Sequence, residues 1–145
     1  MKHCLSICLA TLAGALVATS VSAETAKTYY PRAGKPFSSA VKIGDYVYVS
    51  GAAGAGADGT FPADFTTQAT NTMNALAAEF KLAGATMDDV YRCTVLLTNM
   101  DNWAAFNGVY MKYFKEGRYP VRMALGVADL RGAAVEVQCE AHVGK

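Results

Sequence analysis

Hydrophobic and polar positions alternate along two parts of the chain, as expected for strands with one buried face. Residues 39–43 and 46–50 flank Gly44-Asp45, and a glycine at the first position of a two-residue loop suits a type II′ β-hairpin. Residues 134–141 form the second part. Val135, Val137, Cys139 and Ala141 share its apolar face, and Glu136, Gln138 and Glu140 share the opposite face.

Two further segments are apolar along most of their length. Residues 90–98 are nearly continuous in this respect, which predicts a strand buried on both faces. Residues 119–127 also predict a strand, although Arg122 interrupts the apolar run.

The helical period marks two helices. Asp64 is a candidate N-cap for a helix that runs to about Ala83, and Gly84 follows its end. Asp101 is a candidate N-cap for a second helix over 102–115. Its inner stripe holds Phe106, Tyr110, Tyr113 and Phe114, with Asn107 beside the stripe and Gly117 after the end.

The predicted order is therefore β-β-α-β-α-β-β, an α+β fold with two helices on one face of a mixed sheet. The other face of the sheet has too few polar residues to remain exposed to solvent, so we expect an oligomer that buries it. Residues 29–37 contain two prolines and should be extended and irregular. The glycine-rich residues 51–59 lack the Lys-Ser/Thr of a phosphate loop and predict a flexible loop.

Residues 1–23 have the layout of a secretory signal peptide. Lys2 precedes an uncharged apolar run, and Val21-Ser22-Ala23 is a small-x-small cleavage site. An anchoring transmembrane helix is the alternative, but Ser, Thr and Gly interrupt the run. We therefore expect cleavage, a single domain over 24–145 that is no longer membrane-bound, and export to the periplasm or beyond.

Charge and residue types exclude several classes of site. The whole chain has 13 Lys and Arg against 12 Asp and Glu, and the leader removes only Lys2, so nucleic-acid binding is not indicated. His142 has no neighbours at metal spacing, so no zinc site is expected. Cys93 and Cys139 could pair in an oxidising compartment, but their strand-like surroundings favour two buried free thiols.

Arg122 is the candidate with the clearest chemistry. A guanidinium stays charged, and burying it without a partner is costly, so the apolar run predicts an anionic partner. One interpretation is a structural ion pair with Glu136 or Glu140. The other is the carboxylate of a small molecule, held by two parallel hydrogen bonds.

Several short motifs occur in the order of a known family. They comprise Phe37-Ser38-Ser39-Ala40-Val41, Val47-Tyr48-Val49-Ser50-Gly51, Thr67-Gln68-Ala69, Ala83-Gly84-Ala85, Val90-Tyr91-Arg92-Cys93-Thr94-Val95, Asn107-Gly108-Val109-Tyr110 with Phe114, Pro120-Val121-Arg122, and Val135-Glu136-Val137-Gln138-Cys139-Glu140-Ala141. With these motifs the chain resembles the RidA (YjgF/YER057c/UK114) family over roughly 36–143.

The resemblance implies a chorismate-mutase-like (bacillus type) α+β domain that assembles as a homotrimer, with ligand pockets between subunits. The activity it implies is hydrolysis of enamine/imine intermediates, such as 2-iminobutanoate and 2-iminopropanoate, to 2-oxo acids and ammonia. No metal or organic cofactor is implied. Arg122 matches the arginine that grips the substrate carboxylate, and Ser50, Gly51 and Asn107 match pocket positions.

Three positions depart from the family pattern. Gln138 stands where active members carry a water-handling glutamate, and Glu136, on the same face of the strand, is a candidate replacement. Phe37 replaces a tyrosine and Ala124 replaces a cysteine, both at substrate-binding positions. Two other functions therefore stay open, namely non-catalytic binding of small carboxylates and a chaperone-like interaction role. The neutral charge and the leader argue against the ribonuclease role described for some relatives.

Overall fold

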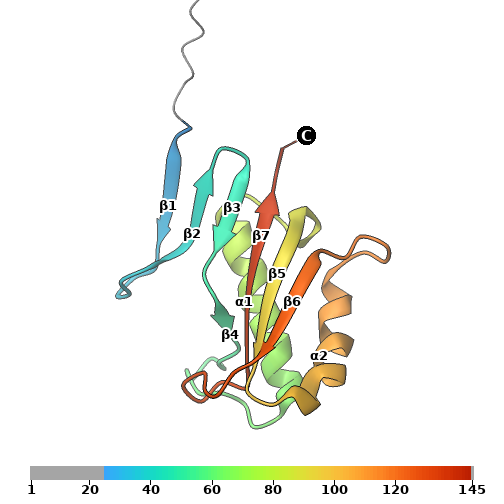
Figure 1. Ribbon diagram of the computed structural model, residues 1–145. Helices are drawn as coiled ribbons and strands as arrows, with labels where there is room; N and C mark the ends of the chain where they lie inside the picture. The colour runs from blue at the N-terminus through green and yellow to red at the C-terminus, as the bar shows by residue number, and fades with distance from the viewer. Residues whose placement is uncertain (1–24, 145) are drawn as a thin grey trace, which may run out of the picture.

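The computed structural model describes residues 25–144, which form one mixed sheet and two helices (Figure 1). The strands are β1 (Lys27–Pro31), β2 (Ser38–Ile43), β3 (Tyr46–Val49), β4 (Ala52–Ala53), β5 (Val90–Leu97), β6 (Val121–Gly126) and β7 (Val135–His142). The helices are α1 (Phe65–Leu82) and α2 (Trp103–Tyr110). Short 3-10 turns occupy Met87–Asp89, Met100–Asn102 and Met111–Tyr113. The predicted leader over 1–23 lies outside the described residues.

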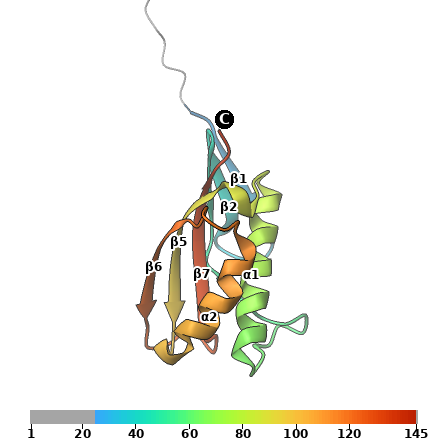
Figure 2. The same ribbon diagram turned by 90° about the vertical axis from the view of Figure 1, so that its right-hand side faces the viewer.

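The sheet has the order β1-β2-β3-β7-β5-β6, with β4 also paired to β7. Strands β5 and β6 run parallel, and the other pairs are antiparallel. Both helices cover the same face of the sheet, so the molecule has two layers (Figure 2). The predicted α+β architecture is confirmed. Within residues 25–144, no helix combines the length and the apolar character needed to cross a bilayer.

Local sequence signals account for the predicted turns and for the first helix. Gly44 turns the β2–β3 hairpin with a φ of 58°, a value that a glycine adopts without steric cost. The side chain of Asp64 caps α1 by accepting a hydrogen bond from the Thr67 backbone N–H at 2.7 Å. Gly84, with a φ of 78°, follows the end of this helix as predicted.

Three local predictions were wrong. Residues 51–59 are not a loop throughout, because β4 forms there and pairs with β7. The segment before β2 is not irregular throughout, because β1 forms there and pairs with β2. Asp101 does not cap the second helix. Instead, Asn99 caps the preceding 3-10 turn by accepting from the Asp101 backbone N–H at 2.9 Å. The helix α2 then begins at Trp103 and ends at Tyr110, shorter than predicted, and a 3-10 turn continues to Tyr113.

The core lies between the helices and the sheet. Met73, Leu76 and Phe80 of α1 are fully buried, as are the inward residues of β7. The alternation predicted for 134–141 is confirmed by this burial. The predicted burial of 90–98 on both faces is not met within a single chain, where Arg92 is exposed and Thr94 and Leu96 are half-buried.

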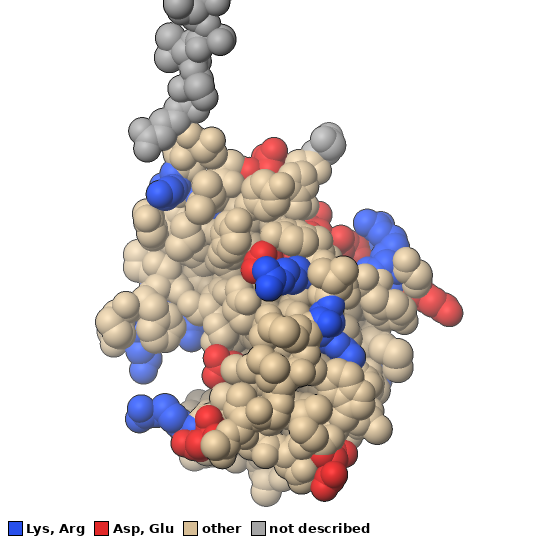
Figure 3. All heavy atoms as spheres, in the orientation of Figure 1, with Lys and Arg blue, Asp and Glu red and all other residues tan. Residues whose placement is uncertain are grey.

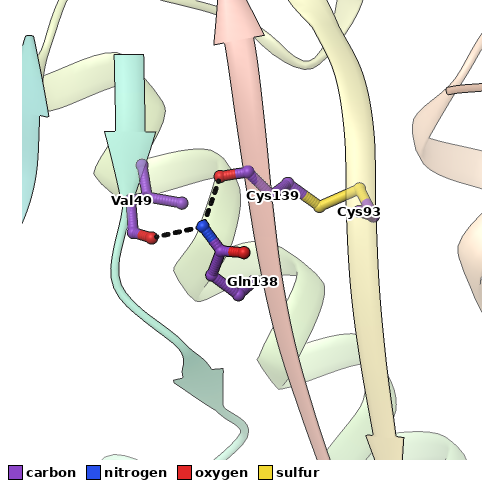
Figure 4. Close-up of a disulfide and its surroundings, with 4 residues drawn as sticks. All are labelled: Val49, Cys93, Gln138 and Cys139. Carbon is purple, nitrogen blue, oxygen red and sulfur yellow. Dashed lines mark hydrogen bonds between the residues drawn. A yellow bond between two sulfur atoms is a disulfide. The ribbon is translucent and has the colours of Figure 1, made fainter. Parts of the chain in front are cut away.

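Cys93 and Cys139 form a disulfide rather than the two free thiols predicted (Figure 4). Their residues are direct partners in the antiparallel β5–β7 pair, with Cα atoms 4.1 Å apart. This register brings the two side chains onto the same face of the sheet, the one covered by the helices. The sequence places both cysteines on strands but does not give the register that joins them.

The sheet face opposite the helices is uncovered in a single chain (Figure 3). It presents mostly uncharged side chains to solvent, with charged groups scattered among them. Large exposed apolar residues on the central and edge strands include Tyr46, Tyr48, Val121, Met123 and Leu125. A patch of this kind is typical of an interface, and the predicted oligomer remains a prediction.

Candidate functional site

Arg122 projects from β6 toward the helices. In the parallel β5–β6 pair it lies opposite Cys93, whose side chain is buried beneath the helix layer. Paired residues share a face of the sheet, so the Arg122 side chain leaves the sheet on this same side.

The guanidinium of Arg122 packs against aromatic rings of α2. Its Cζ lies 4.6 Å from the ring centroid of Trp103, 4.6 Å from that of Tyr110 and 5.9 Å from that of Phe106. At these distances the cation is attracted by the electron-rich faces of the rings.

The predicted ion pair of Arg122 with Glu136 or Glu140 does not form. Glu140 accepts hydrogen bonds from Tyr91 at 2.7 Å and from Arg92 at 3.5 Å, on the uncovered face of the sheet. Within residues 25–144, Arg122 makes no ion pair and no hydrogen bond through its side chain. Its N–H donors are therefore available to a ligand.

A pocket of about 570 Å³ opens beside this guanidinium. Its lining consists of Asn107, Tyr110, Met111, Tyr119, Pro120 and Arg122. Burial raises the pKa of Tyr110 to about 12, while the nearby Arg122 charge opposes this rise, so the phenol is neutral at pH 7. The pocket thus combines one cation, one amide and an apolar wall, which suits a small anion with an apolar part.

Gln138 lies on the opposite face of the sheet. Its register partner on β5 is Thr94, which in turn lies opposite Met123 on β6, an exposed residue of the uncovered face. The Gln138 side-chain amide donates to the carbonyl of Val49 at 3.2 Å and, more weakly, to that of Cys139 at 3.4 Å (Figure 4). The amide nitrogen therefore links β7 to the end of β3. The amide oxygen remains available to accept a hydrogen bond.

The remaining predicted residues near Gln138 lie around the bend between β3 and β4. The Ser50 hydroxyl donates to the Ser38 carbonyl at 2.7 Å, which fixes the bend against β2. Gly51 lies against the side chain of Glu136, whose carboxylate occupies the space that a Cβ would need. Phe37, just before β2, is exposed, and its ring lies 5.4 Å from Cζ of Arg32.

One chain thus divides the predicted site into two groups. The arginine half-site comprises Asn107, Arg122 and the half-buried Ala124, which shares the face of Arg122. The glutamine half-site comprises Ser50, Gly51 and Gln138, with Glu136 beside them, whereas the ring of Phe37 lies beside Arg32. Because the sheet separates Arg122 from Gln138, the two half-sites cannot enclose one small ligand within a single chain.

Sequence reasoning missed the aromatic partner Trp103. It lies three residues before Phe106 and seven before Tyr110, so it extends the predicted stripe by one turn. This helical spacing is the sequence signal that places Trp103 on the same face as Phe106 and Tyr110. Met111 and Tyr119, which line the pocket, carry no such pattern because one follows α2 and the other precedes β6.

The described part of the chain holds no cluster of three or more His, Cys, Asp or Glu residues able to hold a metal ion. The two half-sites themselves contribute one guanidinium, two side-chain amides, a hydroxyl and the carboxylate of Glu136.

Comparison with known proteins identifies the family. The family model described as Endoribonuclease L-PSP matches residues 27–143. A 2-iminobutanoate/2-iminopropanoate deaminase from Mus musculus is 33% identical over 120 residues, which cover 81% of this chain and 88% of the mouse protein. A RutC family protein from Haemophilus influenzae is 34% identical over 104 residues, covering 69% of this chain and 80% of that protein.

Comparison with solved structures supports the same family assignment. RidA from an Antarctic Psychrobacter superposes with a TM-score of 0.72 at 30% identity, covering 83% of this chain and 99% of that one. A Rid-family protein from Yersinia pestis gives a TM-score of 0.75 at 30% identity, covering 81% of this chain and all of that one. The expected chorismate-mutase-like fold is confirmed by these likenesses. The chain therefore belongs to the RidA (YjgF, Endoribonuclease L-PSP) family.

Proposed function

We propose that this protein is an exported imine/enamine hydrolase that converts 2-iminobutanoate-type compounds to 2-oxo acids and ammonia. One observation carries the proposal. The Arg122 guanidinium lines a pocket and, within residues 25–144, has no carboxylate partner, so its donors are available to a substrate carboxylate. The deaminase names of relatives at about one-third identity support the same chemistry.

For this reaction the protein needs mainly to orient the substrate and to transfer protons. Arg122 holds the carboxylate, and a water molecule adds to the C=N carbon. The C–N bond of the resulting carbinolamine then breaks, nitrogen leaves as ammonia, and the water oxygen stays as the new carbonyl. Both protons of the water must pass to nitrogen, and a positioned acid-base group contributes roughly 100- to 10,000-fold to such a step.

Glu136 is the proposed proton carrier. Gln138 can hold a water molecule through its amide oxygen, but an amide does not exchange protons usefully at pH 7. The carboxylate of Glu136 lies against Gly51, within the glutamine half-site, and so brings an acid-base group to the place where Gln138 lacks one.

A homotrimer is part of this proposal, because the two half-sites face different sides of one sheet. A neighbouring subunit that covers the exposed apolar face could set its own glutamine half-site against the arginine half-site. Export is also part of the proposal. The leader layout of residues 1–23 and the disulfide Cys93–Cys139 both suit an oxidising compartment.

The test is imine hydrolysis by the protein starting at Glu24. An amino-acid oxidase would generate 2-iminobutanoate in place, and the parent would be compared with Arg122→Ala, Glu136→Gln and Gln138→Glu. Arg118→Ala, at an exposed arginine outside the Arg122 pocket, serves as the control. We expect the parent and Arg118→Ala to accelerate hydrolysis, and Arg122→Ala and Glu136→Gln to lose most of it.

Other outcomes separate the remaining functions. An inert parent that becomes active with Gln138→Glu would mean a carboxylate-binding site that lacks its proton carrier. This is the second candidate function, and the amide at position 138 favours it. If all variants are inert and 2-oxo acids do not bind, the deaminase proposal and the binding alternative both fail, and an interaction role becomes the leading account.

A further inference from the structure

We propose that Trp103 and Tyr110 are positioning residues for Arg122, which clamp its guanidinium between two rings so that only its N–H edge meets the ligand. The inference rests on the proposed function, in which Arg122 binds the substrate carboxylate. It adds two residues to which that function assigns no role.

The geometry of α2 supports a clamp. Trp103 and Tyr110 are seven residues apart, which is roughly 10 Å along a helix axis. Both ring centroids lie 4.6 Å from the same carbon of Arg122, so both rings contact the guanidinium. Phe106, between them in sequence, lies 5.9 Å from that carbon and closes the inner side.

The rings themselves are held in place. Tyr110 is buried, and its ring packs against Phe106 with centroids 5.5 Å apart and against Phe114 at 4.7 Å. Trp103 is half-buried and packs against the core. A clamp built on packed helix residues can hold a long side chain from an edge strand in one orientation.

Such a clamp changes how the arginine binds. A free arginine side chain samples many rotamers, and part of this freedom is lost each time a carboxylate orders it. Stacking removes that freedom before the ligand arrives, so less is lost on binding. Bidentate recognition also needs the carboxylate in the guanidinium plane, and rings that contact the guanidinium leave its N–H edge for that approach.

The competing interpretation is that the two rings only pack the core. It predicts that replacing them changes stability, and changes ligand affinity independently of Arg122. A double-mutant cycle separates the two accounts, because residues that act through Arg122 lose their effect once Arg122 is removed.

The experiment uses Trp103→Leu and Trp103→Phe, each in the parent protein and with Arg122→Ala, and titrates 2-oxobutanoate by NMR. We expect Trp103→Leu to weaken binding about 5- to 10-fold, the worth of one partly desolvated stacking contact. Trp103→Phe should stay within about 3-fold, because a ring remains. In the Arg122→Ala background, Trp103→Leu should have no further effect, and a persisting loss would overturn the proposal.

A second measurement needs no ligand. The ¹⁵N relaxation of Arg122 Nε reports the order of the guanidinium in the free protein. It should show more motion in Trp103→Leu and Tyr110→Leu, but not in Trp103→Phe, Tyr110→Phe or the control Tyr119→Leu. Tyr119 lines the same pocket without stacking on the guanidinium. Unchanged motion in both leucine variants would overturn the proposal even if a variant binds poorly for other reasons.

The outcomes also distinguish this inference from the function on which it rests. If Arg122→Ala binds 2-oxobutanoate as well as the parent does, the proposed carboxylate site fails. If Arg122→Ala abolishes binding while Trp103→Leu leaves both affinity and Nε motion unchanged, only the clamp fails. A loss in Tyr110→Phe equal to that in Tyr110→Leu would assign the effect to the hydroxyl and overturn the role of the Tyr110 ring.

Discussion

Gly51 makes room for Glu136. A Cβ at position 51 would overlap the carboxylate of Glu136, which rests against the backbone there. The contact joins the bend after β3 to the uncovered face of β7, and it brings an ionisable group to a half-site whose expected glutamate is replaced by Gln138.

Gly51→Ala should therefore lower activity more than stability. The methyl group displaces the end of a flexible side chain, which costs little, but it moves the proposed proton carrier. We expect at least a 10-fold fall in the rate of imine hydrolysis with a change in unfolding free energy within about 1 kcal/mol. Gly108→Ala, where a Cβ meets nothing within 4 Å, is the matched control. Equal rates in the two variants would remove Glu136 from the reaction.

Mixed assemblies should test whether one site draws on two subunits. Arg122→Ala alters only the arginine half-site, and Gly51→Ala alters only the glutamine half-site. Subunits of the two variants, unfolded and refolded together, should regain about one quarter of the parent activity, because a quarter of randomly formed interfaces then pair two intact half-sites. Each variant refolded alone is the control. A mixture no more active than the controls would contradict a shared site.

The disulfide should carry a large part of the stability. It joins residues 46 apart in sequence, and closing a loop of this length contributes roughly 4 kcal/mol in the chain-entropy model. We expect the double variant Cys93→Ala/Cys139→Ala to lose about 2–4 kcal/mol in urea denaturation. The parent protein in reductant should approach the same midpoint after unfolding. Identical midpoints with and without reductant would show that no disulfide is present.

The buried carboxylate of Glu79 should depend on Arg32. The Glu79 side chain is only 9% exposed and forms an ion pair with Arg32, whose side chain is 34% exposed. Arg32→Met leaves that carboxylate without its cation and should cost about 2 kcal/mol of unfolding free energy. The double variant Arg32→Met/Glu79→Met should recover most of the loss. A double variant that is less stable than Arg32→Met would contradict this account.

Stability should fall at alkaline pH because burial raises the pKa of Tyr110 from 10 to about 12. Between these values the folded protein holds a proton that the unfolded chain has released, so unfolding free energy decreases as pH rises. Below pH 10 the contribution is fully present. Tyr110→Phe should lose stability less steeply between pH 10 and 12, as measured by urea denaturation at each pH. Equal slopes for Tyr110→Phe and the parent would mean that a group other than Tyr110 causes the loss of stability.

The sequence predicted the layers of this fold because hydrophobic periods report which side of each element is buried. The faces of β7 followed from this pattern, and the cap of α1 followed from the preference of aspartate for the N-cap position. Register does not follow from it. The pairing of Cys93 with Cys139, and the placing of Arg122 and Gln138 on opposite faces, depend on how strands align, and a strand's own period leaves that open.

The candidate site was predictable only in part for the same reason. Arg122 could be identified from the sequence because it is a charge within an apolar run. Its contacts with Trp103 and Tyr110 could not, because they join β6 to α2, and the sequence does not show how these two elements pack. Local propensity also failed just before α2, where Asn99 rather than Asp101 acts as a cap, and the element it caps is the 3-10 turn and not the helix.

Because the disulfide is buried, it must form before the helices pack against the sheet during folding. Both sulfur-bearing residues are at most 1% exposed beneath the helix layer, where an oxidising enzyme cannot reach them. Thiol oxidation needs access to the attacking sulfur. Strands β5 and β7 must therefore meet and be oxidised while the helices are still undocked. A newly made chain that packs its helices before oxidation would stay reduced and would reach its final stability only by opening again.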